Sequence, residues 1–446
     1  MTGGAAEVGG SGGVVAGGGG TPPAGGAEPA GGAGAAGGVG VSGEAGSSSG
    51  GTGIGGAAGG GGSGGGAGAG CVDRAWVVWR FRGGAALLEG DLTVTWGKRS
   101  VLVDEPLVPS TTTLSPAGLV KANLARETLP ISIDAMGYSP DGAIAMVGWP
   151  PQLFVGHVAD ANLTFMDLES EVEGTTATHV AWDGEAFTLD VRDDTTLVTL
   201  RRSESGEVVL PPTPFGTVGA LSYVNYDSGY KSSTNPVSGR TYVFDAGGSR
   251  WLAGHERSGE TIAWIPELDA IELEPPPCDG SDGWGVVCGT GAGKPAVAAD
   301  PEGGVWVAWH QSTVRELSLV GGVQHYDADG NAGPFIWFRT PEGDRGAAEN
   351  AALYAYSATR ALLVSSSGTA LYAFDVEGST ISEARALTDH VPNPTLNEGF
   401  RELVLLRDES DLTWLVFEQD TRIRALKVAP GCLYPTHPDP ASIMEW

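Results

Sequence analysis

Hydrophobic and polar side chains alternate with a period of two in many short segments of the chain. Residues 187–192 (Phe-Thr-Leu-Asp-Val-Arg) alternate strictly, which is the pattern of a half-buried strand. Three further segments are apolar on both faces: 240–244, 304–309 and 361–364. Such runs are typical of strands buried between two layers. Residues 115–125, with Ser115 and Pro116 at the start, are the segment whose pattern allows one short helix. The rest of the pattern predicts an all-β protein.

These strands belong to a longer repeat. In six places a turn with small or acidic residues precedes an apolar strand: 139–147, 182–189, 237–244, 300–309, 357–364 and 407–416. A second hairpin signal follows several of them, as in Ser205-Gly-Glu, Asp329-Gly-Asn and Glu377-Gly-Ser. A turn, a strand, a turn and another strand at a spacing of roughly 40–60 residues indicate four-stranded propeller blades.

One unit supports a more specific comparison. Residues 300–309 (Asp-Pro-Glu-Gly-Gly-Val-Trp-Val-Ala-Trp) are followed by 326–331 (Tyr-Asp-Ala-Asp-Gly-Asn). The pair resembles the blades of exported bacterial β-propeller repeat proteins, and the Gly-rich N-terminal segment resembles those of envelope-associated propellers. The resemblance extends over about 130–430, with one further candidate blade at 72–110. It implies a fold and not an activity.

Blade number and ring closure follow from the length of the repeat region. Dividing residues 71–446 by a blade of about 54 residues gives seven blades, and by about 63 residues gives six. We predict seven blades, with six as the alternative. In propellers an N-terminal strand commonly pairs with the last blade. Residues 75–81 (Ala-Trp-Val-Val-Trp-Arg-Phe) and 422–428 (Arg-Ile-Arg-Ala-Leu-Lys-Val) suit that pairing.

The four cysteines form an even set, which fits two disulfides in an exported protein. Cys71 and Cys432 flank the two segments expected to close the ring, and a disulfide between them would lock it. Cys278 and Cys288 bracket a short loop that a local disulfide would stiffen. Four cysteines allow three connectivities, so both pairings are hypotheses.

Residues 1–70 differ in composition from the rest of the chain. They hold 34 of the 72 glycines, three acids, no Lys or Arg and no aromatic residue. Such a segment buries too little apolar surface to offset its ordering entropy, so we predict a disordered tether at 1–70 and a propeller domain at 71–446. The tether favours display outside the cytoplasm, secreted or in the cell envelope, with a signal peptide encoded upstream of Met1. The sequence before Cys71 (Ala-Gly-Ala-Gly) is lipoprotein-like but lacks the apolar segment that lipidation requires.

The net charge is −29, with 54 Asp and Glu against 25 Lys and Arg. Phosphate recognition needs clustered cations, so the composition excludes a nucleic-acid-binding protein. No apolar run approaches the length of a membrane span. The acidity favours cationic ligands, and Asp327, Asp329 and Asn331 resemble the first half of a calcium loop. The later positions of that motif are missing, and Asp-Gly-Asn is primarily a hairpin signal.

Catalytic, metal and cofactor motifs are absent from the sequence. The seven histidines are scattered, and residues 289–294 (Gly-Thr-Gly-Ala-Gly-Lys) lack the spacing of a phosphate-binding loop. Most Trp residues lie inside predicted strands, where core packing explains them. Trp284, beside Asp279 and Asp282 in the loop between Cys278 and Cys288, is the exception that we expect to be exposed and to contact a ligand.

These features predict a binding propeller without a catalytic, cofactor or metal site, acting as a monomer on a protein or glycan. Two alternatives stay open. One is a polysaccharide hydrolase or lyase that uses carboxylates at the channel, roughly 5–10 Å apart. The other is a structural spacer without a binding site.

Overall fold

The structure is a computed structural model. The chain divides into Met1–Gly64 and Gly65–Trp446, and all described residues lie in the second unit. They comprise residues 73–74 and those parts of 83–428 that remain outside the following segments: 99–107, 116–119, 126–131, 150–151, 169–170, 173–175, 194–195, 218–229, 246–250, 266–290, 293–294, 313–319, 340–349, 367–369, 389–399, 408–412 and 420–421. The predicted domain boundary at residues 70 and 71 falls outside the described residues.

The described residues form seven antiparallel sheets, which we number as blades 1 to 7 in chain order. Blade 1 contains β2 (Gly83–Leu88), β3 (Asp91–Lys98), β4 (Val108–Leu114) and β5 (Val120–Ala125). Blade 2 contains β6 (Ser132–Tyr138), β7 (Ala143–Trp149), β8 (Gln152–His157) and β9 (Thr164–Asp167). Blade 3 contains β10 (Thr176–Trp182), β11 (Phe187–Asp193), β12 (Thr196–Arg202) and β13 (Val208–Thr217).

The remaining blades repeat this order with small additions. Blade 4 contains β14 (Tyr230–Thr234), β15 (Thr241–Asp245), β16 (Trp251–His255) and β17 (Thr261–Ile265). Blade 5 contains β18 (Gly291–Ala292), β19 (Ala296–Ala299), β20 (Val305–Ser312), β21 (Val320–Tyr326) and β22 (Ala332–Arg339). Blade 6 contains β23 (Ala351–Ser357), β24 (Arg360–Ser366), β25 (Leu371–Glu377), β26 (Thr380–Ile381) and β27 (Arg385–Ala386). Blade 7 contains β28 (Arg401–Arg407), β29 (Thr413–Gln419), β30 (Arg422–Val428) and the N-terminal β1 (Asp73–Arg74).

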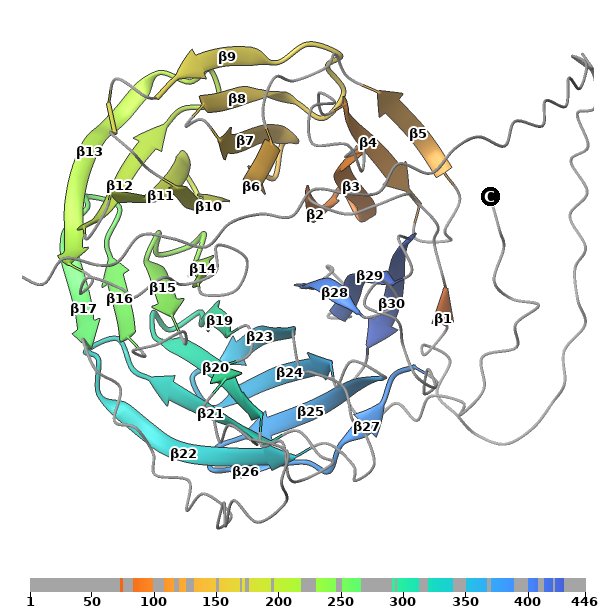
Figure 1. Ribbon diagram of the computed structural model, residues 1–446, viewed down its shortest axis with the longest axis vertical. Helices are drawn as coiled ribbons and strands as arrows, with labels where there is room; N and C mark the ends of the chain where they lie inside the picture. Colours follow the sequence, from red (N-terminus) through yellow and green to blue (C-terminus); the bar gives the residue numbers. More distant parts are fainter. Residues whose placement is uncertain are drawn as a thin grey trace, which may run out of the picture. The chain divides into compact units, whose positions relative to one another are not determined.

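The innermost strands of the blades contact one another in a closed circle. In chain order β2, β6, β10, β14, β19, β23 and β28 each contact the next, and β28 contacts β2 again (Figure 1). Radial four-stranded sheets around a closed circle define a β-propeller. The prediction of an all-β propeller is confirmed, and the seven sheets correspond to the larger of the two blade numbers that the repeat length allowed.

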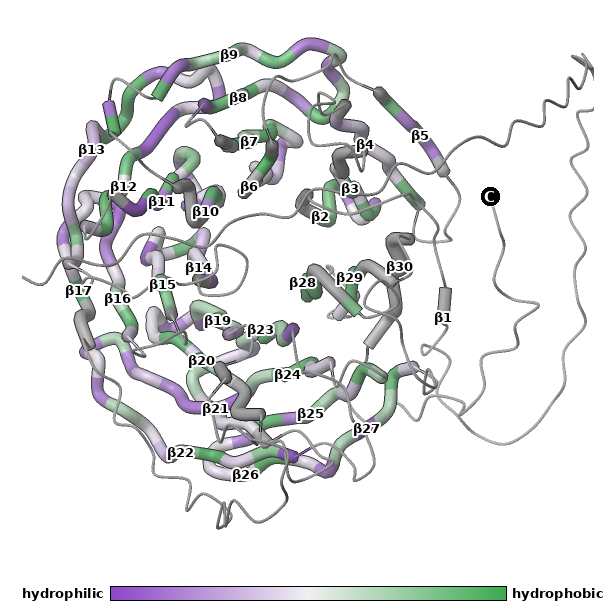
Figure 2. Tube along the Cα trace, in the orientation of Figure 1, coloured by the Kyte–Doolittle hydropathy of each residue, from purple (hydrophilic) through white to green (hydrophobic). Residues whose placement is uncertain are grey.

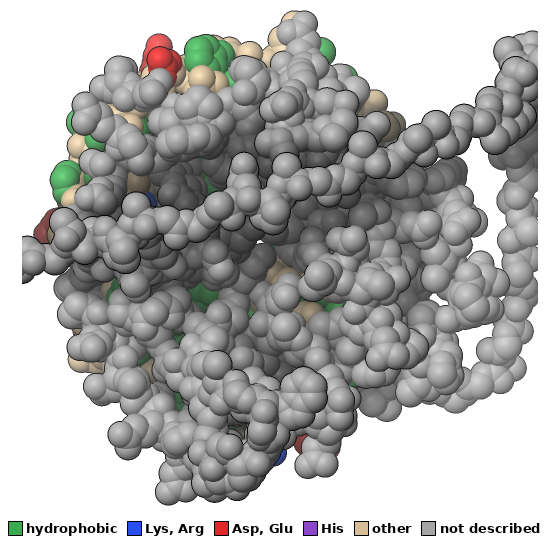
Figure 3. All heavy atoms as spheres, in the orientation of Figure 1, with side chains coloured by type: hydrophobic (Ala, Val, Ile, Leu, Met, Phe, Trp, Pro, Cys, Tyr) green, Lys and Arg blue, Asp and Glu red, His purple; other side chains and the backbone are tan. Residues whose placement is uncertain are grey.

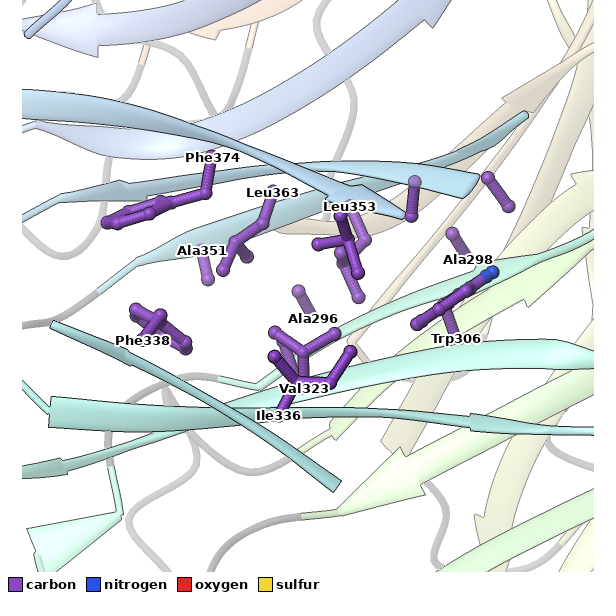
Figure 4. Close-up of a cluster of buried hydrophobic side chains, with 14 of the residues drawn as sticks. Ala296, Ala298, Trp306, Val323, Ile336, Phe338, Ala351, Leu353, Leu363 and Phe374 are labelled. Carbon is purple, nitrogen blue, oxygen red and sulfur yellow. The ribbon is translucent and has the colours of Figure 1, made fainter. Parts of the chain in front are cut away.

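The hydrophobic core lies in layers between neighbouring blades. Figure 4 shows one layer, in which Trp306, Val323 and Phe338 of blade 5 face Leu363 and Phe374 of blade 6. Five further joints hold similar clusters shared by two blades. At the joint of blades 1 and 2 the cluster consists of blade 2 residues, and its Tyr138 hydrogen-bonds the backbone of Gly84 and Thr95 in blade 1. Each fully buried Val, Leu or Phe contributes about 1.5–3 kcal/mol. Because each layer belongs to two blades, a blade depends on its neighbours for its stability.

The N-terminal strand completes the last blade. β1 pairs with β30 on the outer side of blade 7, with Asp73 opposite Leu426 and Arg74 opposite Ala425. The expected closure therefore occurs with 422–428 as one partner. The other partner differs from the prediction, because Asp73 and Arg74 make the pairing, while 75–81 lie outside the described residues. The first and last described strands thus share one sheet.

The helix allowed at 115–125 is wrong. Residues 120–125 form β5, the outer strand of blade 1, in register with β4. Spacing of apolar residues along an exposed edge strand is weakly constrained, because only one of its edges and part of its faces are packed. The described residues contain no helix that is long and apolar enough to cross a membrane.

The outer strands β9, β13 and β22 mix hydrophilic and hydrophobic residues along their length (Figure 2). Exposed hydrophobic side chains also occur on them, notably Phe165 of β9, Val208 of β13 and Trp337 of β22. Acidic and hydrophobic groups are both visible at the rim in Figure 3. β13 contains Pro211, Pro212 and Pro214, and proline has no N–H to offer a further strand. This outer edge is therefore protected against pairing with another chain.

Candidate functional site

The two faces of the ring differ in the length of their connections. On one face, which we call the turn face, the first strand of a blade joins the second and the third joins the fourth. The longest of these connections that are described throughout are 158–163 and 235–240. On the opposite face, the loop face, the second strand joins the third and one blade joins the next. Connections leaving the loop face include 218–229, 340–350 and 266–290. The fold thus directs its longest connections to one face.

A buried polar residue occupies the first turn of blades 2 to 5 on the turn face: Ser139, Asp183, Asn235 and Asp300. Each side chain accepts hydrogen bonds from backbone N–H groups of its own turn. Asp183, for example, accepts from Glu185 and Ala186 at 3.0 and 2.9 Å. Local bonds of this kind close a tight turn and satisfy backbone donors that would otherwise be buried without a partner.

Side chains of neighbouring blades bind these turns together. Arg257 donates to the backbone carbonyls of Asp183, Pro236 and Val237. Tyr242 donates to the carbonyl of Gly303 at 2.5 Å, and its burial raises its pKa to about 12. Three more bonds extend the series: Asn235 Nδ2 to Asp300 O, Trp306 Nε1 to Ser357 O, and Tyr356 with Thr413 Oγ1. A belt of hydrogen bonds therefore runs along the turn face from blade 3 to blade 7.

Two of the buried turn acids also bind a basic side chain from the third strand of the same blade. Arg201 on β12 binds Asp183 through two hydrogen bonds, of 2.6 and 3.1 Å. His325 on β21 donates from Nε2 to Asp300 Oδ2 at 2.6 Å. Burial by itself raises the pKa of Asp300, but the hydrogen bonds from His325 and Gly304 outweigh it and hold that pKa below its usual value. The pairs fix the turns rather than present a reactive group.

Exposed acids surround the belt. They include Glu89, Asp141, Asp160, Glu185, Glu204, Glu207, Glu260, Glu302, Asp327 and Asp329, all in or beside the turns of this face. Their summed field repels anionic partners and attracts cationic ones, and salt screening weakens both effects as the ionic strength rises. The Asp327 carboxylate accepts hydrogen bonds from the N–H groups of Asp329 and Asn331, so it closes the hairpin. Among the described residues, no group of three His, Cys, Asp or Glu could hold a metal ion.

Blades 3 and 4 meet through an apolar cluster and, beside it, through polar side chains. His179, Asp190 and Thr199 form a cross-strand row over β10, β11 and β12, and Thr234, Thr241 and His255 form the facing row over β14, β15 and β16. His179 Nε2 and Thr234 Oγ1 share a hydrogen bond of 3.1 Å. His255 Nε2 donates to Asp190 Oδ1 at 2.9 Å. We call these six residues the polar joint.

The charge state of His255 follows from its partners. Its Nδ1 faces the carbonyl of Glu256 at 2.9 Å, and its Nε2 faces the Asp190 carboxylate. Both partners only accept hydrogen bonds, so both ring nitrogens carry protons and the imidazole is charged. Burial lowers the pKa of His255, but the charge and hydrogen bond of Asp190 outweigh it and raise that pKa. Burial likewise raises the pKa of Asp190, and His255 reverses the direction, so this pKa is lowered.

Sequence reasoning missed the polar joint. The alternation at 187–192 predicted a half-buried strand, but Asp190, on its polar face, is buried. In a propeller both faces of every inner strand are covered by neighbours, so a polar face is buried against another polar face. Two rows that lie about 50 residues apart in sequence meet only in the assembled ring. Sequence periodicity contains no signal for which two polar faces meet.

The residues predicted to bind a ligand, Asp279, Asp282 and Trp284, lie outside the described residues. So do the four cysteines predicted to form disulfides: Cys71, Cys278, Cys288 and Cys432. Residues 278–288 belong to the connection between β17 and β18, which starts and ends at the loop face. The alternative of a hydrolase or lyase needs carboxylates at the channel. The described side chains of the innermost strands include no Asp or Glu. Asp134 and Glu402 belong to β6 and β28, and their side chains are not among those that the structure describes.

Comparison with known proteins gives likeness only at the level of the fold. No protein-family model and no curated protein matches the sequence. Among solved structures, one described as YCF48 bound to D1 peptide matches with a TM-score of 0.45 and 12% identity over 80% of this chain and 98% of that chain. BBS1N in complex with ARL6DN, soaked with mercury, matches with a TM-score of 0.47 and 9% identity over 81% of this chain and 98% of that one. The fold assignment rests on the sheet order and the closed circle of inner strands.

Proposed function

We propose that this chain is a protein-interaction propeller that binds its partner on the loop face. The observation that carries the proposal is the difference in connection length between the two faces of the ring. The turn face is closed by short turns and tied across blades by buried hydrogen bonds such as Tyr242 to Gly303. The loop face receives every long connection between blades, including 266–290. Loops held by a rigid scaffold are the usual location of binding residues.

A propeller suits this task because its blades hold widely spaced connections at fixed positions. The layers between blades are close-packed, with Val307, Leu363 and Val416 fully buried. A partner that contacts several connections at once therefore meets a preorganised surface and loses less entropy on binding. Asp279, Asp282 and Trp284 belong to the longest of these connections, and an aromatic residue beside acids suits the centre of an interface with a basic segment.

We further propose that the propeller is displayed outside the cytoplasm on its Gly-rich N-terminal segment. Support comes from composition: 34 of the 72 glycines lie in residues 1–70, without Lys, Arg or an aromatic residue. A Gly-rich coil of this length spans on the order of 45 Å. The even number of cysteines fits an oxidising compartment. Fractionation of the source cells, with protease shaving of intact cells, tests this placement directly.

The binding proposal can be tested with a displayed peptide library selected on the purified full chain. Enriched peptides are measured by titration against three proteins: the unmodified chain, a variant with residues 266–290 replaced by a Gly/Ser segment of equal length, and a control with Glu204→Lys and Glu207→Lys. We expect loss of affinity of tenfold or more in the first variant and little change in the control, because Glu204 and Glu207 lie on the turn face.

Two results would contradict the proposal. The first is equal affinity of the peptides for the unmodified chain and the loop variant, with loss of affinity in the turn-face control. This result would show that the interface lies on the turn face. No enriched peptide, together with binding on a glycan array, would replace the protein partner by a carbohydrate. Circular dichroism and thermal unfolding of each variant establish that the propeller is intact before affinities are compared.

A further inference from the structure

The polar joint differs from the other joints of the ring in what holds it. The apolar cluster between blades 3 and 4 consists of Leu197, Phe215, Val243, Trp251 and Ala253. Beside this cluster, the imidazole of His255 lies 2.9 Å from the carboxylate of Asp190, and both side chains are 1% exposed. Among the described residues, no other pair of blades is joined by a carboxylate and an imidazole. The attachment of blade 3 to blade 4 thus combines an apolar cluster with a buried ion pair.

A second histidine stands next to this ion pair. His179 is directly opposite Asp190 in the β10–β11 register and shares a hydrogen bond with Thr234 across the joint. Thr234 in turn shares a hydrogen bond of 2.9 Å with Thr241. His179 is half-buried on the innermost strand of blade 3, so a proton can reach it without prior unfolding. A proton there would place a second cation beside charged His255, with one carboxylate between them.

The other charges facing the joint do not neutralise a second imidazolium. On the blade 3 side, Asp183 is bound by Arg201, and Glu185 is exposed with the Arg257 guanidinium 3.0 Å away. On the blade 4 side, Arg257 adds a positive charge and Glu256 is paired with Arg240. The acids at the turn end of the joint therefore already have cationic partners. Among these acids, only Asp190 has its carboxylate within hydrogen-bond distance of the His255 ring.

We propose that the polar joint is an acid-sensitive latch: protonation of His179 separates blade 3 from blade 4 before any other joint of the ring opens. In a closed ring every blade packs against two neighbours. The ring therefore opens at the joint that weakens first. The latch lies away from the β1–β30 closure of blade 7. Opening would therefore separate two blades that are consecutive in the chain, and the pairing of β1 with β30 would stay intact.

The direction of the pH dependence follows from the three titrating groups. Burial lowers the pKa of His179 from 6.5 to about 4. The unfolded chain then binds more protons than the folded one between these values, so stability falls as the pH drops from about 6.5 to about 4. The pKa of His255 is raised, so its contribution is complete below about 6.5 and is lost as the pH rises through its folded value. The pKa of Asp190 is lowered, so its contribution is lost only below about 3.8. The joint is strongest near pH 6.5.

Hydrogen exchange with mass spectrometry on the full chain tests the latch. Exchange is measured at pH 6.5, 5.5 and 4.5 and corrected for the intrinsic rate at each pH. We expect peptides from β10, β11, β14 and β15 to lose protection first on acidification, while peptides from β20, β24 and β29 keep theirs. Loss that begins in another joint, or is uniform around the ring, would overturn the proposal.

A variant separates the proton from the hydrogen bond. His179→Gln keeps an amide that can bond Thr234 but cannot gain a proton in this range. We expect the opening constant of the joint at pH 5 to fall roughly tenfold or more relative to the unmodified chain. The matched control is His157→Gln, on β8 of blade 2, which should leave the acid response unchanged. If His179→Gln does not fold, the exchange map of the unmodified chain decides alone; an unchanged acid response in a folded His179→Gln would refute the latch.

Discussion

Arg201 Nε lies 2.6 Å from Asp183 Oδ2, and the two side chains are 9% and 1% exposed. The pair connects the third strand of blade 3 to the first turn of the same blade, and the Asp183 carbonyl continues the connection to Arg257 of blade 4. One acid therefore fixes a turn, receives a buried cation and marks the end of a blade joint. A blade keeps its shape here through groups that lie far apart in sequence.

Asp183→Ala should strongly destabilise the propeller. It leaves the buried Arg201 guanidinium with only the exposed Glu185 carboxylate, 3.5 Å away, and removes the acceptor of two backbone N–H groups. The expected cost is about 3–5 kcal/mol. Urea unfolding followed by Trp fluorescence measures the loss. Glu204→Ala, on an exposed turn of the same blade, is the control and should change stability by about 0.5 kcal/mol or less. Equal effects of the two substitutions would show that the buried pair contributes nothing special.

Much of the fold could be predicted because its signals are local. Turns expected at 183, 206, 239, 330 and 378 are present, and glycines at 184, 206, 239, 330 and 378 have positive φ, from 59° to 97°. Period-two strands between such turns repeat often enough to imply blades. The position of the closing strand was less accessible, because only two residues, Asp73 and Arg74, pair with β30.

The candidate site was less predictable, since it depends on which blades are neighbours. His179 and His255 lie far apart in sequence, and neither stands in a motif with Asp190. Their meeting requires blade 3 to pack on blade 4 in one particular register. By contrast, Trp306 and Trp309 were correctly assigned to the core, because their places inside an apolar strand determine burial whatever the neighbouring blade.

Gly137 marks a point where two inner strands approach each other closely. A Cβ at this position would lie 2.8 Å from the Val180 carbonyl oxygen and 2.9 Å from the Ala181 Cα. Both are backbone atoms, so they cannot move aside without shifting β10. Gly137→Ala should therefore destabilise the protein by about 1–3 kcal/mol, measured by urea unfolding.

The control for this substitution is Gly156→Ala on β8 of the same blade. Its added Cβ would meet Leu163 Cδ2 at 2.7 Å, the end of a flexible side chain, with the next atom at 3.5 Å. Leu163 can adjust its rotamer, so the expected loss is smaller. A larger loss for Gly156→Ala than for Gly137→Ala would contradict the close approach of β6 and β10.

Asp300 should contribute to stability in a pH-dependent way. Its pKa is lowered in the folded protein, so its contribution is complete above the ordinary value of about 3.8 and is lost as the pH falls through the folded value. Asp300→Asn should therefore be less stable than the unmodified chain at pH 6, with the difference shrinking below pH 3.8. Thermal unfolding of both proteins from pH 3 to 7 measures this; a difference that stays constant with pH would assign the role of Asp300 to hydrogen bonding alone.

A disulfide between Cys71 and Cys432 should strengthen the closure of the ring. β1 begins at Asp73 and β30 ends at Val428, and Asp73 pairs with Leu426, so the two cysteines flank paired strands. In the chain-entropy account a loop of this length contributes roughly 6 kcal/mol, against roughly 3 kcal/mol for a loop as short as that between Cys278 and Cys288. Protein made in an oxidising compartment should lose more thermal stability through Cys71→Ser with Cys432→Ser than through Cys278→Ser with Cys288→Ser. Alkylation and mass spectrometry without reductant measure the free thiols of the unmodified protein. Four free thiols would show that neither disulfide forms, and that the ring closes by strand pairing alone.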